Sequence, residues 1–65
     1  MTKLKFTLSD NTVVTHADFH NAIRFCEEEF GYEGEAWELV KGTKNQIELH
    51  SFLIDDEIDV ELVEE

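Results

Sequence analysis

The sequence predicts a single small α+β domain over residues 1–65, in the order β-β-α-β-β-β, with one helix packed on one face of an antiparallel or mixed sheet. One stretch with helical periodicity and several short stretches of alternating apolar and polar residues predict this class. At 65 residues the chain is near the lower size at which one core suffices without disulfides or a metal. Its single cysteine excludes an internal disulfide.

Residues 14–32 are predicted to form an amphipathic helix. Thr15 is the expected N-cap, and Asp18 three residues later completes an aspartate version of the capping box. Gly31 suits the left-handed position that follows a helix. At about 100° per residue, one narrow stripe holds Phe19, Ala22, Ile23, Cys26 and Phe30. This stripe is the expected contact of the helix with the sheet.

An N-terminal hairpin is predicted before the helix. Residues 3–8 alternate between apolar and polar side chains, as expected of a half-buried strand. Asp10 and Asn11 suit the centre of a tight turn. A return strand of three to five residues then follows, with Leu8 opposite Val13 on the core face.

The C-terminal half of the chain also shows alternation. Three strands are expected there, over residues 36–41, 46–54 and 58–63. Pairing Leu39 with Ile47, and Leu53 with Ile58, turns all of their apolar side chains toward the core. A slip of one residue would invert every one of these side chains, so the two registers support each other.

The same registers would place charged side chains on the outer face of the sheet. This face would carry Glu38, Glu48, His50, Phe52, Asp59 and Glu61. Glu38 would lie directly opposite Glu48, where like charges destabilise a sheet. Alternate residues of a strand stand about 6.8 Å apart, which is of the order of the phosphate spacing along a nucleic-acid strand. The array would therefore imitate a phosphate backbone; the alternative is an ordinary solvated sheet face.

Charge is the strongest compositional signal. The formal net charge is −11, and it is uneven along the chain. Residues 1–26 carry two acids against three bases, whereas residues 27–65 carry fourteen acids against two bases. Such a surface repels nucleic acid and anionic membranes and attracts basic proteins. The alternative is that the acidity serves solubility alone.

Three consecutive glutamates form a second candidate binding region. Glu27, Glu28 and Glu29 occupy the last turn of the predicted helix, where negative charge meets the negative end of the helix dipole. An exposed helix end tolerates this charge at physiological salt, which is the structural alternative to a binding role.

Catalytic and metal sites are not expected. The sequence has no glycine-rich phosphate loop, and Cys26 lies on the apolar stripe, where a thiol is inert. His16 and His20 are four residues apart on the predicted helix, but His50 is an uncertain third ligand. We therefore expect no enzyme, no cofactor and no metal. No signal peptide or membrane span is visible, so we expect a cytoplasmic protein.

The function expected from the sequence is that of a small acidic protein-binding domain. The favoured form is a nucleic-acid-mimicking inhibitor or decoy of a basic DNA- or RNA-binding protein, of the kind found in phages and mobile elements. The alternative is a general interaction module or small subunit, which includes a homodimer, whose acidity serves solubility. We expect no direct binding to nucleic acid or membrane. The partner-binding residues would be Glu38, Glu48, His50, Phe52, Asp59, Glu61, Glu27, Glu28 and Glu29.

Overall fold

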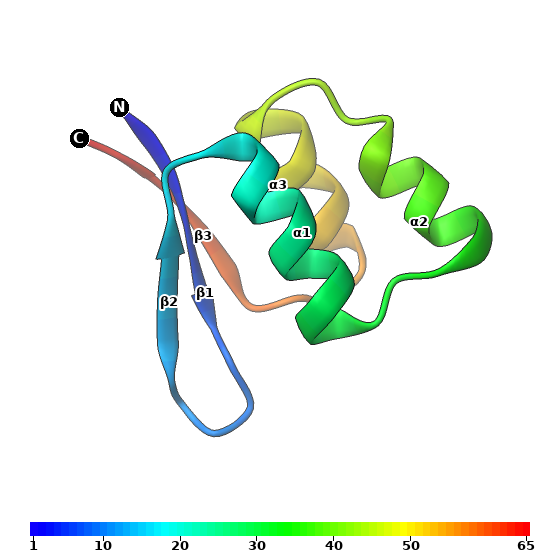
Figure 1. Cartoon of the computed structure of the whole chain (residues 1–65). Helices are drawn as coiled ribbons and strands as arrows, with labels where there is room; N and C mark the ends of the chain where they lie inside the picture. Colours follow the sequence, from blue (N-terminus) through cyan, green and yellow to red (C-terminus); the bar gives the residue numbers. More distant parts are fainter.

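A computed structural model describes all residues from Met1 to Glu65. The elements are β1 (Thr2–Thr7), β2 (Val13–His16), α1 (Phe19–Phe30), α2 (Gly34–Lys41), α3 (Gln46–Asp55) and β3 (Val60–Glu64). The three strands form an antiparallel sheet in the order β2-β1-β3. Helices α1 and α3 lie between this sheet and α2 (Figure 1). The molecule is therefore a small mixed α/β domain whose sheet is covered on one face.

The β1–β2 hairpin forms as the alternation predicts, but its register differs by one residue. Thr7 pairs with Val13, so the predicted pairing of Leu8 with Val13 is wrong. The N–H of Leu8 instead donates to the carbonyl of Thr12 at 2.8 Å, and Asn11 adopts a left-handed φ of 70°. A three-residue loop that ends in a left-handed residue is a common hairpin connection, and asparagine tolerates that conformation.

Helix α1 begins later than the sequence predicts. Its N-cap is Asp18, whose carboxylate accepts a hydrogen bond from the N–H of Asn21 at 3.1 Å. The predicted cap Thr15 lies in β2, because the return strand of the hairpin runs on to His16. The helix ends as predicted, at Gly31, which is left-handed with φ 68°.

Helices α2 and α3 replace two of the predicted strands. The N-cap of α3 is Asn45, whose side chain accepts from the N–H of Glu48 at 3.0 Å. Leu49 and Leu53, four residues apart, are both fully buried, which is the spacing of one helix face. These leucines also fit an alternating pattern, and that ambiguity misled the strand prediction.

The β-β-α-β-β-β order is consequently not observed. Leu39 and Ile47 lie on different helices and form no strand pair, and Leu53 and Ile58 do not pair across strands. β3 is the one predicted C-terminal strand that forms, and it pairs with β1 at the edge of the sheet.

The core lies between the sheet and the helices. Its buried apolar residues are Leu4, Phe6, Ala22, Cys26, Val40, Leu49, Leu53 and Val60. The ring of Phe6 in the central strand lies 4.8 Å from that of Phe25 and 5.9 Å from that of Phe30, between ring centroids. Burial raises the pKa of the Cys26 thiol to about 12, so this thiol stays protonated and is not a nucleophile at neutral pH.

Candidate protein-binding surface

The acidic array expected on the sheet is not assembled. Glu38 lies on α2; Glu48, His50 and Phe52 lie on α3; Asp59 precedes β3; and Glu61 lies on β3. On a helix, residues two apart point about 160° away from each other, so Glu48 and His50 face different directions. Phe52 is half-buried, with its ring 5.9 Å from that of Tyr32. The regular spacing of a strand therefore does not apply to this set.

Three of these acidic residues take part in local contacts. The carboxylate of Glu48 accepts a hydrogen bond from the N–H of Lys44 at 3.3 Å. Glu38 forms an ion pair with Lys41 at 3.2 Å on the same helix. The backbone carbonyl of Asp59 accepts from the N–H of Thr7 at 3.0 Å, next to the last pair of the β1–β3 ladder. Glu61 lies in register with Lys5 on β1. Each of these acidic residues therefore sits in a different local setting, and together they do not form one site.

The structure instead gathers acidic residues where two helices end. Helices α1 and α3 run in similar directions, and their C-terminal ends lie at the lower side of the helical layer in Figure 1. We call this region the acidic end; its residues are Glu27, Glu28, Glu29, Glu33, Asp55, Asp56 and Glu57. All of these residues are exposed, and none is in an ion pair. Neither helix has a basic residue in its last turn. The negative charge there is not compensated by the chain itself.

Tyr32 joins the two halves of the acidic end. Its hydroxyl donates a hydrogen bond to the carboxylate of Asp56 at 2.7 Å, which links the residues after α1 to the end of α3. Burial of the ring, then the hydrogen bond and the charge of Asp56, raise the pKa of Tyr32 above its ordinary value. The phenol therefore remains a donor and fixes the position of one acidic side chain.

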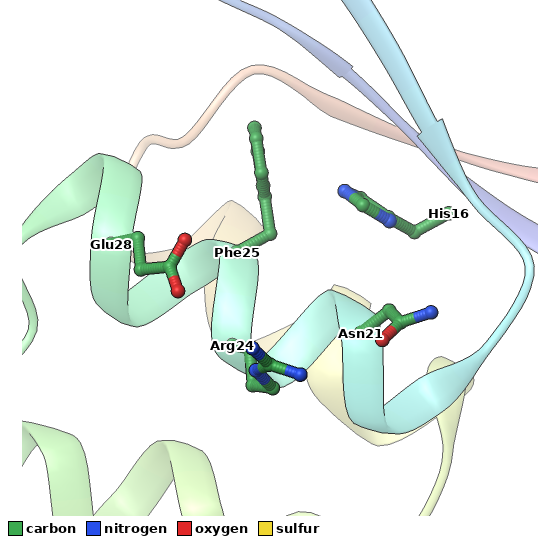
Figure 2. A pocket seen from close by; sticks show the side chains of 5 residues that line it. All are labelled: His16, Asn21, Arg24, Phe25 and Glu28. Atoms are coloured by element: carbon green, nitrogen blue, oxygen red, sulfur yellow. The ribbon is translucent and has the colours of Figure 1, made fainter.

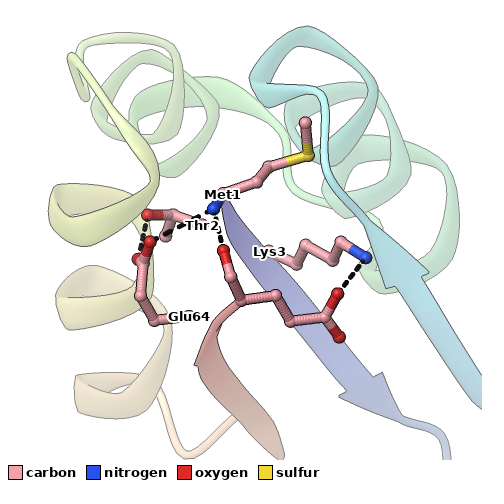
Figure 3. A network of polar contacts seen from close by, with 5 residues as sticks. Met1, Thr2, Lys3 and Glu64 are labelled. Carbon is pink, nitrogen blue, oxygen red and sulfur yellow. Dashed lines mark hydrogen bonds and ion pairs between the residues drawn. The ribbon is translucent and has the colours of Figure 1, made fainter.

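Acidic side chains at the end of the sheet where Thr2 pairs with Glu64 have partners within the chain (Figure 3). Glu64 accepts from the hydroxyl of Thr2 and lies 3.3 Å from the N-terminal ammonium of Met1. The carboxylate of Glu65 pairs with Lys3 at 2.7 Å. These contacts lower the pKa of both carboxyl groups: for Glu64 the hydrogen bond from Thr2 comes first, and for Glu65 that from Lys3. The negative charges of Glu64 and Glu65 are therefore paired with cations of the chain, whereas those of the acidic end are not.

A shallow pocket of about 210 Å³ lies between β2 and α1 (Figure 2). Its lining residues are His16, Asn21, Arg24, Phe25 and Glu28. The His16 ring lies 4.8 Å from that of Phe25, and its Nε2 atom is buried without a hydrogen-bond partner. Arg24 forms no ion pair, although Glu28 is four residues away. The pocket offers nitrogen atoms beside an aromatic wall, and the one cysteine of the chain lies in the core and not in this pocket.

The metal hypothesis on the helix has no geometric basis. His16 is the last residue of β2, whereas His20 lies on α1, so the two do not share a helix face. No group of three or more histidine, cysteine, aspartate or glutamate residues is placed to hold a metal ion. No helix is both long and apolar enough to cross a bilayer.

Sequence reasoning missed the contribution of α3 to the surface. The strands predicted over residues 46–54 and 58–63 leave Asp55, Asp56 and Glu57 in a connection between strands, whereas the observed helix brings them to the end of α1. The missed signal was Asn45, a good N-cap three residues before Glu48. Ile47 and Ile54 were placed on strands, so their outward position on a helix was not foreseen.

Comparisons with known proteins found no relative of this chain. The chain matches no protein-family model, no curated protein and no solved structure.

Proposed function

We propose that this chain is a small acidic protein-binding domain whose partner is a basic protein. The observation that carries the proposal is the acidic end, where exposed carboxylates from two helix termini gather without an ion pair to any cation of the chain. Basic proteins are steered toward such a surface, and anionic molecules are repelled from it.

The charge at the acidic end opposes folding. Each carboxylate in a last helical turn meets the negative end of the dipole, at roughly 0.3–1 kcal/mol. The repulsion among neighbouring acids adds to this. Proteins accept local costs of this kind at functional sites. A 65-residue domain has only a small free energy of unfolding. Keeping an unfavourable cluster of charges in such a domain therefore favours a binding role over chance.

A nucleic-acid-binding protein is the best-suited partner class. Such proteins present lysine and arginine side chains that neutralise phosphates and release counterions. The carboxylates of the acidic end are able to occupy the same basic side chains. Occupation would exclude nucleic acid, so the domain would act as an inhibitor or decoy. This form of mimicry relies on charge density at helix ends and not on regular strand spacing.

A general interaction module is the second candidate, in which the acidity serves solubility. Exposed apolar side chains on α2 and α3 favour it: Leu39 is 56% exposed, Ile47 62% and Ile54 47%. A homodimer belongs to this candidate too. The interaction module predicts that binding to the partner persists as salt rises, whereas the acidic decoy predicts that binding is lost.

Capture from a cell lysate with matched variants tests the proposal. The immobilised chain is compared with a variant in which Glu27, Glu28 and Glu29 are changed to Gln. A control variant carries the same change of charge elsewhere, at Glu38, Glu61 and Glu64.

The expected result is recovery of basic nucleic-acid-binding proteins, released as salt rises from about 50 to 200 mM. The acidic-end variant should lose them, and the control variant should keep most of the binding. The captured proteins should also be released by excess duplex DNA. Equal losses in both variants, or a captured set that withstands salt and DNA, would contradict the proposal.

A further inference from the structure

The outward face of α3 combines two kinds of side chain. At about 100° per residue, the buried side of this helix centres on Leu49, Leu53 and Gln46. The opposite side carries Ile54, Ile47, Ser51, Asp55 and Glu48, in that order around the helix axis. All five are exposed. The face therefore has an apolar edge next to an acidic edge, with one small serine between them.

The apolar edge has no partner within the chain. Ile47 is 62% exposed and Ile54 47% exposed, and neither belongs to the core or packs against it. They are seven residues apart, so both stand on one side of α3 about 10.5 Å apart along its axis. Two large aliphatic side chains at this spacing form a pair of anchors on an otherwise polar surface.

A second copy of the chain is a poor occupant of this face. In a two-fold dimer the same patch contacts itself, so Glu48 and Asp55 of both copies would meet. The net charge of −11 on each copy adds long-range repulsion. Charge complementarity requires a partner that supplies cations beside apolar side chains.

We infer that this face docks a basic amphipathic helix of the partner protein. Its apolar side chains would lie on Ile47 and Ile54, while its lysine or arginine side chains would pair with Glu48 and Asp55. A helix is the matching shape because its residues seven apart repeat at the same axial distance as the two isoleucines. The inference rests on the proposed function, because it names the partner element that a basic protein would present.

Titration with a designed peptide tests this docking. The probe is a synthetic leucine/lysine helix of about 18 residues with leucines at i, i+3, i+4 and i+7. A peptide of the same composition, scrambled so that no apolar stripe forms, controls for charge. Binding is followed by amide chemical shifts of the isotope-labelled chain and by the dissociation constant.

The key variant carries Ile47→Ser and Ile54→Ser. Both sites are exposed, so the fold should persist, which circular dichroism checks. The variant should bind the amphipathic peptide at least about tenfold more weakly. The matched control Leu39→Ser changes an equally exposed apolar residue on α2, and its affinity should stay within about twofold. Glu48→Gln with Asp55→Asn should weaken binding at low salt and have little effect at high salt.

Four outcomes overturn the inference. The first is equal affinity for the amphipathic and scrambled peptides. The second is unchanged binding by the Ile47→Ser, Ile54→Ser variant. The third is self-association through these isoleucines in sedimentation experiments. The fourth is no binding of the amphipathic peptide at low salt. One case of the second outcome separates this docking face from the proposed function. Peptide binding that survives the isoleucine changes but is lost when Glu27, Glu28 and Glu29 become Gln would reject this docking face and leave the proposed function standing.

Discussion

Helices α1 and α3 end at the same side of the molecule, but their last residues are built differently. After α1, the left-handed position is taken by Gly31 with φ 68°, and its N–H donates to the carbonyl of Glu27 at 3.1 Å. After α3, the left-handed residue is Glu57 with φ 63°, whose N–H donates to the carbonyl of Ile54 at 3.1 Å. A side chain in this conformation costs about 1–2 kcal/mol, which glycine avoids.

The comparison shows where the chain carries residues other than those that would stabilise a helix end most. At the end of α1 the backbone is relaxed and only the charge is unfavourable. At the end of α3 a charged residue also occupies a glycine position. Both departures increase negative charge at the acidic end, which is the pattern expected where binding is selected over stability.

The largest expected effect tests whether α3 holds the acidic end in place. Leu53→Ala removes a fully buried side chain beneath it and should lower the free energy of unfolding by about 2–5 kcal/mol. Ile54→Ala on the exposed side should change it by less than about 0.5 kcal/mol. Urea unfolding followed by Trp37 fluorescence measures both. Similar values for the two variants would mean that α3 does not pack as described.

A reciprocal pair of substitutions tests the two helix ends directly. Gly31→Ala should destabilise by about 1 kcal/mol through the backbone alone, because an added Cβ meets no atom within 4 Å. Glu57→Gly should stabilise by about 0.5–1 kcal/mol.

Glu57→Gln is the control for this pair, since it removes the charge and keeps the left-handed side chain. Glu57→Gln should therefore give only a part of the stabilisation that is expected from Glu57→Gly. A gain from glutamine equal to that from glycine would assign the cost to charge and not to the backbone.

The link between the two ends rests on Tyr32. Tyr32→Phe removes the hydrogen bond to Asp56 and should lower stability by about 1 kcal/mol at neutral pH. The folded chain holds the phenolic proton more tightly than the unfolded chain, where the pKa is near 10. This contribution is therefore complete below pH 10 and is lost as the pH rises above about 10. Thermal unfolding of both proteins from pH 7 to 11 should show that the phenylalanine variant lacks this part of the alkaline loss.

The smallest effect per residue concerns the charge on α1. Changing Glu27, Glu28 and Glu29 to Gln should stabilise the domain by about 0.3–1 kcal/mol for each glutamate at low ionic strength. The gain should shrink at about 0.5 M salt, where screening already removes the repulsion. The control with Glu38, Glu61 and Glu64 changed should show no such gain, because Glu38 and Glu64 have cationic partners. Equal stabilisation in both variants would mean that total charge matters and its location does not.

The sequence predicted those parts of the fold whose signals agree with one another. In the hairpin, alternation and turn residues point to one answer, and in α1 the apolar stripe and Gly31 do so too. α3 carries apolar residues on two sides: Ile47, Leu49 and Leu53 share one face of a strand, while Leu49 and Leu53 alone also share one face of a helix. Only tertiary packing, which buries Leu49 and Leu53 and leaves Ile47 exposed, decides between them.

The candidate surface, too, was predictable only where it follows from a local sequence pattern. That Glu27, Glu28 and Glu29 sit exposed at the end of a helix follows from the periodicity of α1. That Asp55 and Asp56 lie near them depends on α3 being a helix and on the hydrogen bond from Tyr32. Such contacts between distant segments leave no local pattern in the sequence.

The pairing of the first and last strands has a consequence for how the domain is made. Thr2 lies in register with Glu64, and Phe6 in the central strand with Val60. The sheet therefore cannot be completed on the ribosome until the segment from Val60 to Glu64 has been synthesised and has left the exit tunnel. Contacts this far apart in sequence also slow folding. Until then Leu4 and Phe6 lack one neighbouring strand, and the growing chain exposes the very residues that later form its core.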